Sequence, residues 1–313
     1  MSDLQPEQQA RQQIDQQLIA AGWAVQNVKS INLAAQSGVA VREFPTATGP
    51  ADYMLFADGK AIGIVEAKKE GVTLSAVHTQ AAEYGTAATK HIQRWADPLP
   101  FIYETTGLET LFTDEREPDA RARKVFAFHR PEELLARVHQ PDTLRDRLKT
   151  FPDLITEPLR DCQIDAVSKL ELSLADNRPR SLIQMATGSG KTYTAATTCY
   201  RLIKHAGAKR ILFLVDRGNL GRQTVNEFQQ FTTPDDGRKF TELYNVQMLG
   251  PAGIDPVAKV TVSTIQRLYA QLAGKEMEED LDEHSGYEAS ATQSNGKKEP
   301  VPISYNPQIP IEE

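Results

Sequence analysis

The sequence of 313 residues has only two cysteines, Cys162 and Cys199, and they do not form a Cys-x-x-Cys pair. Such sparse cysteine usage suggests a reducing compartment, which we take to be the cytoplasm. No apolar run approaches the roughly 18 residues that a membrane-spanning helix needs. The N-terminus also lacks the basic and then apolar order of a signal peptide. These absences predict a cytoplasmic protein without a membrane segment.

The sequence also lacks an excess of positive charge, because its net charge is −7. The negative net charge comes from residues 275–313, which contain ten acidic residues and three lysines. The rest of the chain is neutral, with 32 acidic and 32 basic residues. A neutral body can still present a basic groove, since the local field governs contact with DNA. Composition therefore neither supports nor excludes a nucleic-acid partner.

The pattern of apolar residues divides the chain into two parts. The first mixes helical spacing with strand-like stretches, and the second alternates strands with helices, which predicts a parallel sheet covered by helices. We expect an α/β protein with one domain at 1–150, a second at 151–273 and a disordered acidic tail at 274–313. The expected helices are 6–21, 74–91, 191–206, 218–231 and 265–272, and the expected strands are 39–44, 52–67, 99–104, 124–128, 181–185, 211–215 and 259–264.

An acidic residue and a Glu-x-Lys pair lie within residues 50–68, PADYMLFADGKAIGIVEAK. Asp52 and Glu66 offer the hard oxygen ligands that Mg²⁺ prefers, and Lys68 shares a strand face with Glu66 by the period of two. A cation neutralises the charge that develops when a phosphodiester is cut, and the lysine can polarise water. Gln80 and Tyr84 lie four residues apart on the following helix, so they share a face. We predict a Mg²⁺-dependent nuclease site at Asp52, Glu66 and Lys68.

The turn between the two strands decides whether the two carboxylates share a face. A two-residue loop, Asp58-Gly59, would place Asp52 and Glu66 on opposite faces of the sheet. A three-residue loop, 57–59, would make them diagonal neighbours on one face. We predict the three-residue loop. The alternative is that the Glu-x-Lys pair only decorates an exposed strand, which its apolar neighbours disfavour because buried charges need a partner or an ion.

Residues 185–192, MATGSGKT, form a phosphate-binding loop. Its glycines let backbone N–H groups approach phosphates, Lys191 supplies charge to the β- and γ-phosphates, and the Thr192 hydroxyl completes a Mg²⁺ shell. Just upstream, EPLRDCQIDAV is similar to a Q motif that reads adenine, although its glutamine could simply cap a helix. The expected ATP-binding residues are Arg160, Gln163, Thr187, Gly188, Ser189, Gly190, Lys191 and Thr192, and Thr192 is also an expected metal ligand.

The order of these motifs resembles the restriction (R) subunit of type I restriction-modification enzymes. Asp52, Glu66-Ala67-Lys68 and Gln80-x-x-x-Tyr84 resemble the PD-(D/E)XK nuclease superfamily, with Ala51 in place of the usual proline. MATGSGKT, LVDRGNLGRQ (214–223) and STIQRLY (263–269) resemble motifs of superfamily-two helicases. The resemblance implies a PD-(D/E)XK domain, in which Gln80 and Tyr84 join the catalytic residues, followed by an incomplete RecA-like lobe.

The resemblance also implies partners and activities. They are double-stranded DNA, methylation and specificity subunits, ATP-driven DNA translocation and cleavage of unmodified DNA. The Asp-Glu-x-His segment of such motors is missing after Lys191, so we expect an N-terminal fragment that binds ATP without hydrolysing it. Two alternatives remain: a helicase fragment whose nuclease-like domain only binds DNA, and a non-catalytic module that contacts other subunits.

Overall fold

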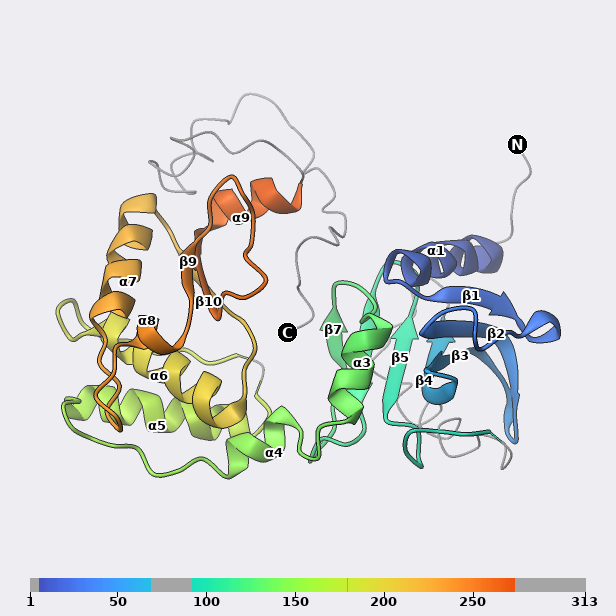
Figure 1. The fold of residues 1–313 in the computed structure, drawn as a ribbon, viewed down its shortest axis with the longest axis horizontal. Coiled ribbons are helices and arrows are strands. Elements are labelled where there is room, and N and C mark those ends of the chain that lie inside the picture. The colour runs from blue at the N-terminus through green and yellow to red at the C-terminus, as the bar shows by residue number, and fades with distance from the viewer. Residues whose placement is uncertain (1–5, 69–91, 179, 274–313) are drawn as a thin grey trace. The chain divides into compact units, whose positions relative to one another are not determined.

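The computed structural model describes residues 6–68, 92–178 and 180–273 (Figure 1). The chain divides into two compact units between Thr143 and Leu144. The first contains a seven-stranded mixed sheet and the second a three-stranded parallel sheet, so the predicted α/β class is confirmed. Within the described ranges no helix is long and apolar enough to cross a membrane. The helix expected at 74–91 and the tail expected at 274–313 lie outside these ranges.

The strands of the first unit lie in the sheet in the order in which they occur in the chain. The pairs β1–β2 and β4–β5 are parallel, and the other neighbours are antiparallel. The elements are α1 (Pro6–Ala20), β1 (Ala24–Asn27), a 3-10 turn (Val28–Ser30), β2 (Gly38–Thr46), β3 (Gly49–Ala57), β4 (Lys60–Ala67), β5 (Phe101–Thr105), β6 (Thr110–Asp114), β7 (Arg123–Val125) and α3 (Pro131–Val138).

Both faces of the central strands β3 and β4 are covered by apolar side chains. Ile14 and Leu18 of α1 pack with Leu134 of α3 in the core on one face. A second core on the other face includes Met54 and Ile64. Because successive strand residues point to opposite faces, β3 and β4 contribute to both cores. Charged residues at the ends of these strands therefore have apolar neighbours, which raises the cost of burying them unpaired.

The second unit is built on a parallel sheet with the strand order β8–β10–β9. Phe228 of α7 and Phe240 of α8 pack with Val260 and Val262 of the central strand in one core. The strand and helix expected around residues 259–272 are confirmed. The elements are α4 (Leu144–Lys149), α5 (Asp161–Ala175), α6 (Lys191–Ala206), β8 (Ile211–Val215), α7 (Gly218–Gln230), α8 (Phe240–Leu243), β9 (Val246–Met248), β10 (Val260–Thr264) and α9 (Ile265–Leu272).

The strand predicted at residues 181–185 is not formed, so that prediction was wrong. This segment pairs with no strand in the described part of the chain, and Leu182 is 95% exposed. An apolar sequence forms a strand only where a neighbour satisfies its backbone hydrogen bonds. The strand expected at 211–215 forms as β8 at an edge of the three-stranded sheet, where Leu212 and Leu214 are each 46% exposed.

Candidate functional site

The hairpin between β3 and β4 turns through two residues, so the prediction of a three-residue loop was wrong. Ala57 pairs with Lys60, and the loop consists of Asp58 and Gly59. Their φ angles are +47° and +74°. Positive φ at both loop residues is the type I′ geometry, whose twist matches that of the flanking strands. With an undisturbed ladder, this loop would place the two carboxylates on opposite faces.

A β-bulge in β4 changes that outcome. Phe56 pairs with Ala61, but its neighbour Leu55 pairs with Gly63, so Ile62 is the extra residue. One inserted residue shifts the phase of every following position, which moves each side chain to the other face.

Beyond the bulge, Tyr53 lies opposite Val65. Asp52 and Glu66 are the next residues on the two strands, so they lie across from each other where the ladder ends. Opposite residues of an antiparallel pair share a face. The predicted convergence of the two carboxylates therefore occurs, although the bulge and not the loop length produces it.

Short contacts connect the predicted nuclease residues. Asp52 Oδ2 accepts a hydrogen bond of 2.8 Å from the backbone N–H of Ala67. Asp52 Oδ1 lies 3.5 Å from Nη2 of Arg11, and Lys68 Nζ lies 3.4 Å from Glu66 Oε2. The structure thus brings Asp52, Glu66 and Lys68 to the same end of the β3–β4 pair. Gln80 and Tyr84 lie outside the described residues.

Glu66 is the most buried carboxylate of this group, with 5% exposure. Burial raises the pKa of its carboxyl group to about 7, with the charge of Asp52 contributing to the rise and Lys68 opposing it. Oxygen Oε1 of Glu66 has no hydrogen-bond partner among the described residues. An apolar setting with an unsatisfied anionic oxygen is costly, and a bound cation would relieve that cost. The donor set therefore fits a divalent cation.

Sequence reasoning missed a third carboxylate beside this pair. The parallel ladder between β4 and β5 pairs Glu66 with Glu104, which is 3% exposed. The charge of Glu104 also raises the pKa of Glu66. The sequence feature that could have indicated this carboxylate is a glutamate within the otherwise largely apolar stretch FIYET.

The described residues contain no group of three or more His, Cys, Asp or Glu side chains placed to hold one ion. Asp52 and Glu66 are accordingly the candidate ligand pair. Two carboxylates suffice for Mg²⁺, which commonly binds one or two of them and completes its shell with water and substrate phosphate.

The predicted phosphate loop leads directly into α6. Gly188 and Gly190 have φ angles of +77° and +84°, a conformation that glycine adopts without strain. Lys191 Nζ donates a 3.2 Å hydrogen bond to the carbonyl of Ala186, which also accepts a 2.7 Å bond from Ser189 Oγ. Lys191 is therefore folded back onto the loop.

Two other expected ligands of this loop differ in their exposure to solvent. Thr187 is exposed at the tip, and Thr192 is half-buried in the first turn of α6. A helix N-terminus with a glycine-rich loop before it favours phosphate groups. The arrangement is therefore compatible with the predicted nucleotide site.

The two residues predicted from the Q motif contact this loop. Arg160 Nη1 donates a 3.1 Å hydrogen bond to the carbonyl of Gly188. Gln163 Nε2 lies 3.2 Å from the carbonyl oxygen of Ser189 and 3.3 Å from that of Gly190. The structure brings both residues to the loop backbone.

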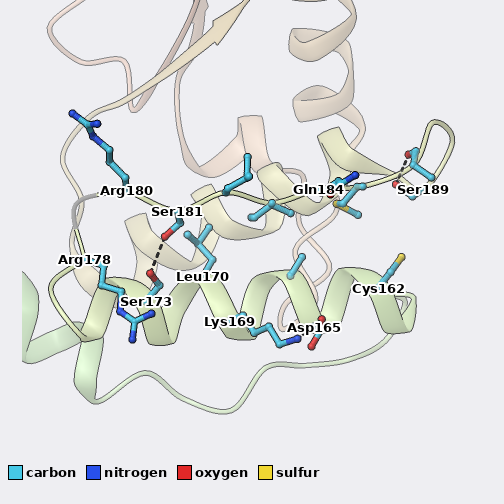
Figure 2. Close-up of a pocket in the computed structure, with 15 residues that line it drawn as sticks. Cys162, Asp165, Lys169, Leu170, Ser173, Arg178, Arg180, Ser181, Gln184 and Ser189 are labelled. Carbon is cyan, nitrogen blue, oxygen red and sulfur yellow. Dashed lines mark hydrogen bonds and ion pairs between the residues drawn. The ribbon is translucent and has the colours of Figure 1, made fainter.

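A hollow of about 640 Å³ lies between α5 and the extended segment before the loop. Figure 2 shows Cys162 and Ser189 at one end of this hollow and Arg178 and Arg180 at the other. Ser173 and Ser181 bridge the two walls with a 2.8 Å hydrogen bond between their hydroxyl oxygens. The segment that precedes the phosphate loop is thus tied to α5 by side chains and not by a strand partner.

Two family models match separate parts of the chain. Residues 20–138 match the family model described as "Type I restriction enzyme EcoKI endonuclease subunit second domain", and residues 156–293 match "Type III restriction enzyme, res subunit". The chain is 30% identical over 314 residues to the type I restriction enzyme EcoKI endonuclease subunit of Escherichia coli K12, covering 84% of this chain and 27% of that protein. The chain belongs to the endonuclease (R) subunit family of type I restriction enzymes.

Two further proteins are similar to parts of this chain. The EcoAI endonuclease subunit of Escherichia coli is 30% identical over 210 residues, covering 60% of this chain and 25% of that subunit. A solved fragment structure assigned to an HsdR subunit from Vibrio vulnificus YJ016 has 18% identity and a TM-score of 0.33, covering 87% of this chain and 49% of that one. The chain spans about a quarter of the length of the curated relatives.

Proposed function

We propose that this chain supplies the DNA-cleaving site of a type I restriction endonuclease, with Asp52 and Glu66 holding Mg²⁺. The observation that carries the proposal is the buried Glu66, whose Oε1 lacks a partner among the described residues, beside Asp52 and Lys68. Bound Mg²⁺ would supply the positive charge that stabilises the phosphorane-like transition state.

Each residue of the site has a proposed task. Asp52 is fixed by the Ala67 N–H, so one of its oxygens stays oriented while the other faces the exposed Arg11. Lys68 Nζ, next to Glu66, is placed to orient a water molecule or to stabilise the developing negative charge on phosphate. Arg11 is 47% exposed at its side chain and can instead contact the phosphate backbone of DNA.

The second proposed activity is ATP binding at residues 185–192. No Asp-Glu-x-His tetrad follows Lys191 in the sequence, and hydrolysis requires an acid that holds Mg²⁺ and orients water. We therefore expect this chain to bind ATP without turning it over. In a longer protein of the family, the same loop would support translocation along double-stranded DNA together with methylation and specificity subunits.

The nuclease proposal is tested by incubating supercoiled plasmid with the full chain and Mg²⁺. Wild-type protein should nick the plasmid, whereas Asp52→Ala and Lys68→Ala should reduce nicking by about a hundredfold or more, as for loss of a group that stabilises the transition state. Glu109→Gln, which changes an exposed carboxylate on the β5–β6 hairpin, serves as the matched control. DNA binding without nicking by the wild type would favour a nuclease-like domain that only binds DNA.

A further inference from the structure

Arg11 contacts the proposed cation site from α1, and this helix is fixed to the sheet by hydrogen bonds. Asp15, one turn after Arg11, accepts bonds of 3.0 and 2.8 Å from the Arg42 guanidinium. It also accepts a 2.9 Å bond from the hydroxyl of Tyr53. Residues four apart lie on the same face of a helix, so Arg11 and Asp15 both face the sheet. The bonds to Asp15 therefore fix the turn of α1 from which the Arg11 side chain extends.

The carboxylates near Arg11 lie in a row across three strands. The register of β2 and β3 places Glu43 opposite Asp52, because the residues before and after each of them are paired with one another. Asp52 in turn lies across from Glu66 of β4. The exposed fraction of the side chain falls along this row, from 62% at Glu43 to 23% at Asp52 and 7% at Glu66. Like charges directly opposite each other destabilise a sheet, so the row needs positive charge.

Two basic side chains supply part of that positive charge. Arg11 bridges the outer pair, with Nη1 at 2.7 Å from Glu43 Oε1 and Nη2 at 3.5 Å from Asp52 Oδ1. Lys68 lies beside the inner carboxylate of Glu66. A cation bound by Asp52 would lie at the same carboxylate as the guanidinium, whichever oxygen it used. The two positive charges would repel each other at this short range.

Arg11 is also open to a ligand from solvent. Its side chain is 47% exposed, compared with 19% for Lys68. A guanidinium carries five N–H donors, and the two contacts of Arg11 with carboxylates use only two of them. Its planar fork matches the oxygens of a phosphate group. A phosphate bound to a cation at Asp52 would lie next to these donors, so Arg11 could exchange a carboxylate oxygen for a phosphate oxygen.

We propose that Arg11 couples cation binding to DNA binding at the cleavage site. This inference rests on the proposed nuclease function of Asp52 and Glu66. Without DNA, Arg11 contacts Asp52 and its charge opposes the binding of the cation. A DNA phosphate draws the guanidinium away from Asp52, while Glu43 keeps it at the edge of the site. DNA and the cation therefore each strengthen the binding of the other.

The inference is tested by replacing Arg11 with methionine in the full chain. Without DNA, Arg11→Met should bind Mn²⁺ about three- to tenfold more tightly than wild type, because a positive charge beside the site is removed. Its nicking of supercoiled plasmid with Mg²⁺ should nevertheless fall by about tenfold or more, because the phosphate loses a charged donor. A short DNA duplex should tighten Mn²⁺ binding by a larger factor in wild type than in Arg11→Met.

Two further variants separate charge from structure. Arg11→Lys keeps the positive charge, so its Mn²⁺ affinity without DNA should stay within about threefold of wild type. Lys124→Met removes an exposed cation of β7 that pairs with Glu109, and it should leave Mn²⁺ affinity and nicking unchanged. A purely structural role of Arg11 predicts that Arg11→Met weakens both Mn²⁺ binding and nicking.

The outcomes distinguish the inference from the proposed function. If wild type binds Mn²⁺ and nicks DNA, but Arg11→Met binds Mn²⁺ equally or more weakly, the inference alone is overturned. Unchanged nicking by Arg11→Met would also overturn it. If wild type binds no Mn²⁺ with or without DNA, the proposed cation site itself fails, and the inference fails with it.

Discussion

Replacing Glu66 with glutamine should make the cation-free chain more stable at high pH while removing the proposed cation site. The pKa of the Glu66 carboxyl rises from its ordinary value of 4.5 to about 7 in the fold. At 1.36 kcal/mol per pKa unit, the ionised carboxylate therefore costs about 3 kcal/mol of folding free energy. A neutral glutamine of the same shape avoids most of this cost, so we expect a gain of about 1–3 kcal/mol at pH 8.

The sign of the pH dependence follows from the direction of the shift. The folded chain holds the Glu66 proton more tightly than the unfolded chain does. The free energy of unfolding therefore carries no penalty from Glu66 below pH 4.5, and the penalty grows as the pH rises through about 7. Glu66→Gln should remove this dependence, so its advantage over wild type should be present at pH 8 and absent at pH 4.

The assay can be confined to the first unit because both tryptophans of the chain, Trp23 and Trp95, lie in it. Urea denaturation followed by tryptophan fluorescence, with EDTA present, gives the free energy of unfolding at each pH. The control variant Glu109→Gln should change the free energy of unfolding by less than about 0.5 kcal/mol at either pH. A Glu66→Gln variant that is less stable than wild type at pH 8 would refute the reasoning, because Glu66 would then be a structural ion-pair partner.

Two further predictions concern buried groups away from the proposed sites. Burial lowers the pKa of His129 to about 3, so the free energy of unfolding should fall as the pH drops from about 6.5 towards 3, and His129→Gln should flatten this slope in the fluorescence assay. In the second unit, Arg201 is 5% exposed and lies 2.5 Å from Glu171 Oε1. Arg201→Ala would leave a largely buried carboxylate unpaired, so circular dichroism should show a loss of about 3–5 kcal/mol, whereas an unchanged midpoint would contradict the assigned pairing.

The sequence alone predicted the convergence of Asp52 and Glu66, but not how it arises. Asp-Gly between two apolar runs is the usual signal of a two-residue type I′ loop, and such a loop does form. The bulge at Ile62 then shifts the register. A bulge depends on packing against neighbouring strands, so no local pattern in the sequence indicated it.

Pairing between strands that are distant in the sequence also explains the other differences between the predicted and the observed structure. Glu104 meets Glu66 only because β5 runs parallel to β4 after a long connection. The apolar stretch at 181–185 has strand composition, yet it forms no strand because none of the described strands pairs with it. The loop motif around Lys191 and the helix after it were predictable, since glycine conformation and helix spacing are local properties.

Titration of Mn²⁺ into the full chain, without nucleotide, tests the central claim that Asp52 and Glu66 form a cation site. At the proposed Thr192 site, nucleotide phosphates would supply the other ligands of the cation. Without nucleotide, Mn²⁺ binding therefore reports on the Asp52–Glu66 pair. We predict that wild-type protein binds Mn²⁺ and that Asp52→Ala and Glu66→Gln each abolish this binding, while Glu109→Gln does not. Equal Mn²⁺ binding by wild type and both carboxylate variants, or no binding by any of them, would contradict the claim.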